Sequence, residues 1–479
     1  MGLSAALLLC ALGVAGLLYL DRDKSFRPSK AIWLPLIWMW IMGSRPLSIW
    51  LSIWLGIGSL GTPGSRLDEQ LDGSPLDAVF LLILLSIGVV VLVRRGRMGP
   101  LLKASLPILI YYVYCLLSVS WSHIPAVALK RWIKDVGDLV MVLVIVTEPE
   151  PIKAMQLWFT RVGLVLFPAS IALSKYSELG RGYDPSGIPV DTGVTTNKNS
   201  LGMVTWVISI GVFWGFFHQF RARRRPGRMR RLVARGTLVG FGIAVLAMAH
   251  SATSIACFAL GSMLIICTYL PFVTRQPRRI HALVLMIMCF GGVAMLFGGE
   301  GAVTGALGRD SSFTGRTDIW KTVIPMCPNP LIGAGFESFW NTYGGNLTAL
   351  GPYLKGINEA HDGYIETYLN LGSIGLCVIS FVFIGGYQRV TAAFRRNHEI
   401  GSLTLAYIAT CAIYSITEAG FRVLTASWFA LLLAVVASSG VAAGLIGNGI
   451  QSVRRRGARR LHALVVSDEL NSSFPRKVG

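Results

Sequence analysis

The feature that most constrains this chain is its series of apolar runs, many of them long enough to cross a lipid bilayer. A transmembrane helix needs about 17–25 predominantly apolar residues. Of the 479 residues, 53% are hydrophobic and 14% charged, against roughly a quarter charged in a soluble domain. We therefore predict an all-α polytopic membrane protein with about 12–13 transmembrane helices. The candidate runs are 2–20, 31–43, 76–93, 104–118, 136–147, 155–174, 201–217, 232–249, 252–273, 280–298, 364–385, 402–417 and 423–446.

The net charge of +20 would suggest nucleic-acid binding in a soluble protein. Here the basic residues cluster in short loops, where they orient helices in the membrane. An even number of spans separates each cluster from the next, so all clusters fit on the cytoplasmic side. The outward loops are then 44–75, 119–135, 175–200, 250–251, 299–363 and 418–422. We expect no nucleic-acid partner and a multi-pass membrane protein.

The chain reads as one membrane domain, residues 1–450, followed by a basic cytoplasmic tail, 451–479, that is predicted to be disordered. The largest element outside the membrane is the loop 299–363, which is rich in glycine, proline and aromatic residues. Its segment 315–327 has the pattern of a short helix with one apolar face. A loop this aromatic is expected to pack against the helix bundle.

One histidine, His361, lies where this loop re-enters an apolar run. A histidine at that position can exchange a proton near neutral pH. Asp362 and Glu366 share a helix face if the next helix begins at 362, and both are candidates to orient the imidazole. The same residues could bind a metal, but no second histidine follows at i+3 or i+4, so no metal site is predicted.

Several cations occur in the outward loops, which normally exclude them. Each alone reads as an interfacial anchor or a local salt bridge. Together with His361 they could line one cavity, and such a cluster suits a diphosphate headgroup without a metal ion. The candidate cations are Arg45, Arg181, Lys198, Arg316 and Arg422, with Asn199, Trp320 and Glu418 as further site candidates.

Four motifs, in this order, resemble the O-antigen ligase and Wzy-type polymerase family, and its exopolysaccharide-polymerase branch in particular. TTNKNSLG at 195–202 resembles an Asn-Lys-Asn segment of that family. GRTDIW at 315–320 resembles its Gly-Arg segment, and PLIGAGFESF at 330–339 its glycine-rich aromatic segment. His361–Gly375 fits its pattern of histidine and two spaced glycines. SRPLSIWL at 44–51 is similar to an outer loop of the polymerase branch.

The resemblance implies a metal-independent, cofactor-free inverting glycosyltransferase, similar to the GT-C class, with its active site facing the periplasm. It implies His361 as general base for the acceptor hydroxyl. Arg316 and Lys198 match diphosphate-binding motif positions, whereas Arg181 and Arg422 are candidates from topology alone. The implied partners are an undecaprenyl-diphosphate-linked oligosaccharide donor, a glycan or lipid A–core acceptor, the lipid bilayer, and flippase and chain-length regulator proteins.

Three functions stay open at this stage. A polymerase would join repeat units, and the segment 44–51 favours it. An O-antigen ligase would transfer finished glycan to lipid A core or another acceptor. A transporter or flippase for lipid-linked glycans is compatible with many spans and an outward cationic cavity, although the sequence has no paired halves or matched broken helices. Sugar identity, linkage and oligomeric state have no signal in the sequence.

Overall fold

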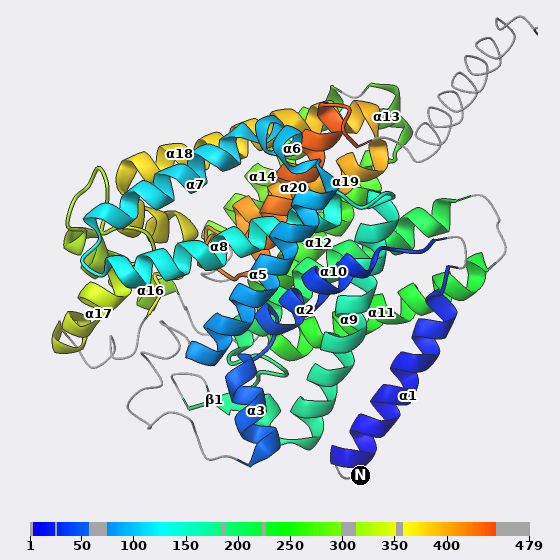
Figure 1. Cartoon of the computed structure of the whole chain (residues 1–479), viewed down its shortest axis with the longest axis horizontal. Helices are drawn as coiled ribbons and strands as arrows, with labels where there is room; N and C mark the ends of the chain where they lie inside the picture. Colours follow the sequence, from blue (N-terminus) through cyan, green and yellow to red (C-terminus); the bar gives the residue numbers. More distant parts are fainter. Residues whose placement is uncertain are drawn as a thin grey trace, which may run out of the picture.

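The computed structural model describes residues 3–23, 26–56, 74–183, 187–222, 227–276, 278–297, 313–350 and 358–446. These residues form a bundle of helices, shown in Figure 1, with one short antiparallel hairpin of β1 (Arg181–Tyr183) and β2 (Pro189–Asp191). The predicted all-α polytopic fold is confirmed. The predicted disordered tail, 451–479, lies outside the described residues.

The helices follow the predicted apolar runs closely, and every run coincides with at least part of a helix. In the first half they are α1 (Leu3–Asp21), η1 (Lys30–Ile32), α2 (Trp33–Met42), α3 (Leu47–Leu55), α5 (Pro75–Arg95), α6 (Met98–Ala104), α7 (Leu106–Ser118), η2 (Val119–Trp121), α8 (Pro125–Val146), α9 (Pro151–Tyr176), η3 (Glu178–Gly180) and α10 (Lys198–Arg221). In the second half they are α11 (Arg228–Ala249), α12 (Ala252–Thr268), α13 (Pro271–Arg275), α14 (Arg279–Phe297), α16 (Phe313–Val323), η4 (Ile324–Met326), α17 (Phe339–Leu350), α18 (Gly363–Arg396), α19 (His398–Tyr414) and α20 (Ala426–Ala442).

Five of the described helices are long and apolar enough to cross a membrane: α5, α9, α10, α11 and α18. The number rises to seven if two bent pairs each count as one span, α2 with α3 at 76° and α6 with α7 at 91°. This is fewer than the predicted 12–13, because several apolar runs form shorter helices within the described residues. Those shorter apolar helices are Ala6–Asp21, Ala252–Thr268, Arg279–Cys289 and Ala426–Ala442.

Helix α8 differs most from its predicted span, 136–147, because it begins at Pro125. The residues of α8 before 136 include charged side chains that ended the apolar run in the sequence. One of these, Asp135, is almost fully buried, as is Asp138 inside the predicted run. The indole of Trp428 donates to Asp135 at 2.6 Å and that of Trp38 to Asp138 at 2.7 Å. Buried carboxylates in a bundle core persist only with such partners.

The core of the bundle lies where α8, α19 and α20 meet α9 and α18. Helix α20 is apolar all round and is buried from Ala426 to Val441, as expected for a helix enclosed by others. Trp158 of α9 stacks on Phe429 of α20, with 5.2 Å between ring centroids. Aromatic stacking of this kind adds to the burial of both rings, and it holds the core in a fixed arrangement.

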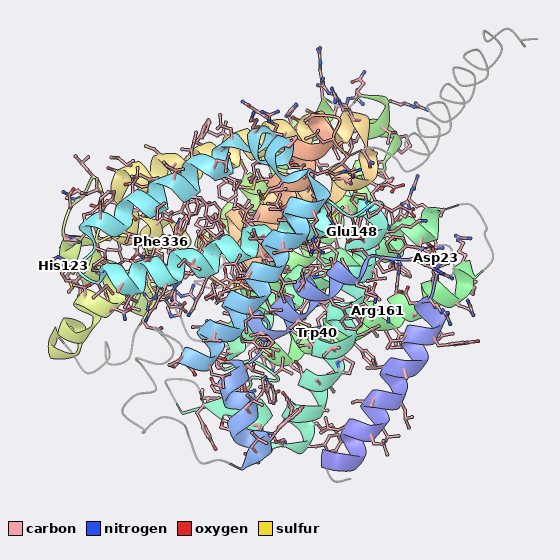
Figure 2. The ribbon with its side chains drawn as sticks, in the orientation of Figure 1. Asp23, Trp40, His123, Glu148, Arg161 and Phe336 are labelled. Atoms are coloured by element: carbon pink, nitrogen blue, oxygen red, sulfur yellow. The ribbon has the colours of Figure 1, made fainter. Side chains whose placement is uncertain are left out.

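The loops divide between two ends of the bundle. Figure 2 shows Asp23 and Glu148 at one end and His123 and Phe336 at the other. At the first, the basic end, Arg95 pairs with Glu148 and Arg231 with Asp23. At the second, the site end, the loops predicted to face outward touch one another. Arg45 contacts Gly193, and Ser122 contacts Ser338. Thr253 and Thr417, at the ends of the spans beside two further outward loops, contact each other.

The aromatic loop packs on the bundle as expected. Its helix α16, predicted over 315–327, buries Ile319 and Val323. These side chains pack in one cluster with Phe339 and Trp340 of α17 and with Leu369 of α18. The loop thus has a small apolar core of its own, closed by the first turns of α18. The packing of α16 against the first turns of α18 places the aromatic loop beside the segment that carries His361.

A break inside α18 joins two of the sequence motifs. Gly372 has φ 66° and ψ −167° and interrupts the helix. Amide groups beyond the break donate to the glycine-rich segment, Ser373 to the Pro330 carbonyl at 2.9 Å and Ile374 to Leu331 at 3.1 Å. A Cβ at Gly372 would lie 2.2 Å from the Leu331 backbone. The motif needs glycine here for its positive φ and for close backbone approach.

We predict that Gly372→Ala destabilises the protein by about 2 kcal/mol or more, since it adds a left-handed strain and a backbone clash. The midpoint of thermal unfolding in detergent should fall by several degrees. Gly240→Ala is the control, because nothing lies within 4 Å of its added Cβ and alanine favours the helix. Equal midpoints for the two variants would contradict this account of the motif.

Candidate functional site

The backbone around His361 is fixed on both sides. On one side, the Ala360 amide donates to Glu366 at 2.6 Å and the Ala360 carbonyl accepts from the Trp320 indole at 2.8 Å. On the other, Asp362 caps α18 by accepting from the amides of Tyr364 and Ile365, both at 2.8 Å. His361 itself has φ 51°. A non-glycine residue with positive φ is uncommon and clusters at functional sites.

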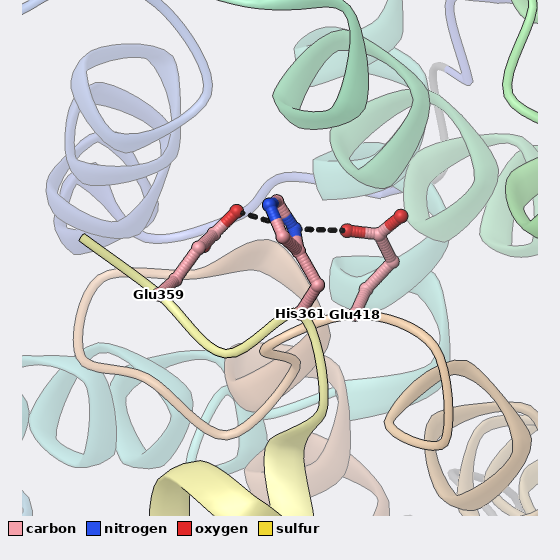
Figure 3. Close-up of side chains that lie close together, drawn as sticks. All are labelled: Glu359, His361 and Glu418. Carbon is pink, nitrogen blue, oxygen red and sulfur yellow. Dashed lines mark ion pairs between the residues drawn. The ribbon is translucent and has the colours of Figure 1, made fainter. Parts of the chain in front are cut away.

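The His361 ring lies between two carboxylates, as Figure 3 shows. Its Nδ1 is 3.0 Å from Oε1 of Glu359 and 3.5 Å from Oε2 of Glu418. Both contacts are ion pairs by distance, and neither has the alignment of a hydrogen bond, so Nδ1 is without a hydrogen-bond partner. The imidazole is therefore held mainly by charge, between an extended segment and the turn that follows α19.

These contacts extend into a row of six alternating charges, which we call the charge chain. Arg316 Nη2 lies 3.0 Å from Glu418 Oε1. On the other side, Glu359 Oε2 lies 3.6 Å from Arg422 Nη1, and Arg422 Nε lies 3.5 Å from Glu337 Oε2. In order, the members of the charge chain are Arg316, Glu418, His361, Glu359, Arg422 and Glu337.

The charge chain sets the protonation of its members. Burial alone would lower the pKa of His361, but the carboxylates of Glu359 and Glu418 raise it to about 10. Burial would raise the pKa of Glu359, whereas His361, Arg422 and Arg316 lower it to about 2. Burial would lower the pKa of Arg422, and its carboxylate neighbours raise it. At neutral pH the ring is thus an imidazolium, and the six charges sum to zero.

The carboxylates expected to orient the imidazole have other partners. Asp362 serves as the N-cap of α18, and burial raises its pKa to about 6. Glu366 is buried and accepts from the indole of Trp340 at 2.8 Å as well as from the Ala360 amide. That prediction is corrected here: Glu359 and Glu418 hold the ring, while Asp362 and Glu366 hold the backbone around it.

The predicted cations separate into two groups. Arg316 and Arg422 belong to the charge chain. Arg45 instead donates to the Gly193 carbonyl at 2.9 Å, and burial lowers its pKa. Arg181 donates to the Ser174 carbonyl at 2.9 Å at the end of α9. The contacts described for these two arginines fix the backbone of the 175–194 loop, so the structure does not gather all five cations around one cavity.

The remaining candidates adjoin the charge chain. Asn199 Nδ2 lies 3.4 Å from Oε2 of Glu418. Lys198 opens α10 one residue earlier and is half-buried. The Trp320 indole donates to the carbonyl of Ala360, the residue before His361, and so helps to fix the backbone there. Glu418 is the common partner, because it contacts Arg316, His361 and Asn199, which come from three separate parts of the chain.

Sequence reasoning missed two members of the charge chain, Glu359 and Glu337. The signal available for Glu359 was its closeness in the sequence, since it stands two residues before His361. Glu337 gave no such signal. It lies in the glycine-rich segment with φ 50°, and only the packing of that segment brings it to Arg422.

Glu359, His361 and Glu418 also have the spacing of a metal site, with their ligand atoms within 4.8 Å of one another. Their charges argue against a cation. Arg316 and Arg422 already neutralise both carboxylates, and a divalent ion would leave an uncompensated positive charge in a partly buried site. Because the charge chain is already balanced, any charged ligand has to exchange with one of its members.

A small cavity of about 20 Å³ lies beside Arg422, with Glu337, Glu366, Tyr111 and Phe336 among its lining residues. It has room for about one water molecule.

The fold and site define a polytopic membrane protein whose polar end holds an imidazolium in a balanced row of arginines and glutamates. Residues 236–380, from α11 into α18, match the model of a family described as O-antigen ligase. The chain is 24% identical over 301 residues to the exopolysaccharide production protein ExoQ of Rhizobium meliloti (strain 1021). That match covers 58% of this chain and 63% of the relative.

These similarities confirm the family resemblance predicted from the motifs. The matched region contains the GRTDIW and PLIGAGFESF segments and the histidine pattern up to Gly375. The Lys198 segment lies before it. The chain is thus a membrane protein similar to the O-antigen ligase and polymerase family.

We predict that the proton on His361 makes stability depend on pH. The pKa of about 10 in the folded protein lies above the ordinary value of 6.5. The stabilisation is therefore complete below about pH 6.5 and is lost as the pH rises through about 10. The thermal midpoint should fall across this window in the wild type and fall less in His361→Gln. Parallel curves for the two proteins would contradict the paired imidazolium.

Proposed function

We propose that this protein is a metal-independent inverting glycosyltransferase, acting on undecaprenyl-diphosphate-linked glycans at the periplasmic face of a bacterial inner membrane. Its most favoured reaction is the polymerisation of exopolysaccharide or O-antigen repeat units. The acceptor is a glycan or a lipid A–core, and flippase and chain-length regulator proteins are the expected partners in the membrane. No cofactor takes part in this proposal.

The observation that carries the proposal is the position of His361 between two carboxylates, with an arginine beyond each. A diphosphate can replace a carboxylate as the partner of a guanidinium, because both anions match its two-pronged geometry. Arg316 is the favoured diphosphate ligand, with Arg422 and Lys198 as further ligands. The phosphate oxygens of the donor would replace Glu418 as the partner of Arg316. The contact between Glu418 and the His361 ring would then loosen.

As general base, His361 must first release the Nε2 proton that it holds at rest to solvent water. In the neutral ring, Glu359 or Glu418 keeps the remaining hydrogen on Nδ1, which leaves Nε2 to accept the proton of the acceptor hydroxyl. The hydroxyl oxygen then forms a bond to the anomeric carbon from the side opposite the diphosphate. The sugar–diphosphate bond breaks with its electron pair on the diphosphate, and the cations stabilise that charge.

The comparisons support two versions of this reaction. The printed name of the relative, an exopolysaccharide production protein, favours a polymerase. The description of the matched family, O-antigen ligase, favours transfer of finished glycan to another acceptor. We favour the polymerase because the match to the relative extends over more of the chain than the match to the family model.

A transporter for lipid-linked glycans is the candidate from another class. One observation bears on it: the described cavity beside the charge chain holds about one water molecule, which is too little space for a glycan. Incubation of the purified protein with a lipid-linked repeat unit separates the candidates. Longer lipid-linked chains indicate a polymerase, chains moved to an added lipid A–core indicate a ligase, and unchanged glycan indicates a transporter.

We predict that His361→Ala lowers the rate of chain growth by roughly 10²–10⁴-fold, the usual worth of a general base. Donor binding should persist because Arg316 and Arg422 remain. The rate is measured from the length of lipid-linked glycan over time. Folding is checked by size-exclusion chromatography in detergent. Normal chain length from a folded His361→Ala protein would remove the base assignment.

We predict that Arg316→Lys lowers the rate of chain growth at least tenfold, because a point charge replaces a two-pronged donor. Arg181→Lys is the matched control, since the described contacts of Arg181 are with the end of α9 and Glu178. The control should keep near-normal activity. Equal rates for both variants would exclude Arg316 from the diphosphate site.

A further inference from the structure

Two buried polar groups beside the charge chain have no hydrogen-bond partner among the described residues. They are the Tyr414 hydroxyl, at the last residue of α19, and the Trp206 indole nitrogen of α10. Both side chains are fully buried. Their rings pack against each other, with 5.4 Å between the ring centroids. Buried donors are almost always paired, because an unpaired one costs free energy, so two unpaired donors in contact need an explanation.

The two donors lie next to Glu418. Tyr414 precedes Glu418 by four residues, and the Glu418 amide donates to the Tyr414 carbonyl at 3.1 Å. One turn of backbone thus places the two residues beside each other. Trp206 reaches the same corner from α10, because it follows Asn199 by seven residues on one helix face, and Asn199 Nδ2 lies 3.4 Å from Glu418 Oε2. The Tyr414 hydroxyl also interacts electrostatically with Glu418 and Arg316.

At rest, Glu418 uses other partners. Its Oε1 lies 3.0 Å from Arg316 Nη2, and its Oε2 lies 3.5 Å from His361 Nδ1. The inference drawn from this rests on the proposed function, in which a diphosphate takes Arg316 from Glu418. Glu418 is almost fully buried, so its carboxylate needs other donors once it loses the guanidinium. Tyr414 and Trp206 have two donors to offer.

We propose that Tyr414 and Trp206 form a second binding position for the Glu418 carboxylate, which it occupies while a diphosphate is bound to Arg316. In that position the carboxylate accepts hydrogen bonds from the Tyr414 hydroxyl and from the Trp206 indole N–H. Both bonds are of the strong kind in which the acceptor is charged. Tyr414 and Trp206 are positioning residues, since they act on the donor only through Glu418.

The second position links donor binding to the state of the histidine. With Glu418 moved to Tyr414, the His361 ring keeps one carboxylate, Glu359, beside Nδ1. One negative neighbour fewer favours release of the ring proton, and a general base needs that release. Donors that are unpaired at rest also destabilise the protein without ligand, and they thereby favour the exchange.

The test measures the affinity for a diphosphate and the resting stability side by side. The full-length protein in detergent is titrated with undecaprenyl diphosphate, which carries the anionic group but no sugar to transfer. Tyr414→Phe removes the hydroxyl and keeps the ring. We expect this variant to bind undecaprenyl diphosphate about tenfold more weakly. The thermal midpoint of the free protein should stay level or rise, because an unpaired buried donor has been removed.

Tyr407→Phe is the matched control from the same helix. Tyr407 is also fully buried, but its hydroxyl donates to the Val207 carbonyl at 2.8 Å. Its loss should lower the thermal midpoint and leave the affinity for undecaprenyl diphosphate near that of the wild type. A merely structural role of Tyr414 would give the same result as this control, so the two measurements together separate positioning from packing.

A second background identifies the group that the Tyr414 hydroxyl receives. In Glu418→Ala no carboxylate is left to move, so the added Tyr414→Phe change should not weaken binding further. If the hydroxyl instead contacts the diphosphate itself, Tyr414→Phe would weaken binding equally in both backgrounds. If Glu418→Ala does not fold, Glu418→Gln takes its place, and the effect of Tyr414→Phe should shrink because the acceptor has lost its charge.

Three results would overturn the inference and leave the proposed function standing, provided that the wild type binds undecaprenyl diphosphate. They are wild-type affinity in Tyr414→Phe, a fall of its thermal midpoint like that of Tyr407→Phe, and an equal effect of Tyr414→Phe with and without the Glu418 carboxylate. A wild-type protein that does not bind undecaprenyl diphosphate would overturn the proposed function and this inference together.

Discussion

The contact of Glu418 with both His361 and Arg316 is the interaction on which the site depends. It joins the turn after α19, the segment before α18 and the helix of the aromatic loop, while Asn199 adds the start of α10. In water such pairs contribute little. At this end of the bundle Glu418 is almost fully buried, so its charge must be paired, and that need brings separate segments together.

The balance of the charge chain has a consequence for chemistry. Three cations alternate with three carboxylates, which makes the resting site neutral and keeps the imidazole protonated. An anionic ligand can enter only by exchanging with a carboxylate, so binding and activation of the ring are linked. The same balance means that a cation at the three residues with metal-ligand spacing would also have to displace charges that are already paired.

Several features of the fold were predictable because they depend on local patterns. Apolar runs located the helices, and the apolar face of 315–327 predicted α16. The glycines of the histidine motif were recognised as a pattern, and the structure supplies the reason for Gly372: it allows the Leu331 backbone to lie against the break in α18. The start of α8 was mispredicted, since charged residues such as Asp135 interrupt the apolar run. The buried Asp135 carboxylate accepts hydrogen bonds from the Trp428 indole and the Tyr112 hydroxyl, which only the tertiary structure supplies.

The sequence by itself determined that this chain is a helical membrane protein, that its basic loops lie at one end, and that His361 lies in a loop at the other. These follow from hydropathy and charge, which act residue by residue. Only the tertiary structure decided which carboxylates hold the ring. Asp362 and Glu366 belong to the start of α18, and their oxygens accept hydrogen bonds from the first amides of that helix and from the Ala360 amide. The imidazole is instead held by Glu359, two residues before it, and by Glu418, which packing of the α19–α20 turn brings beside it.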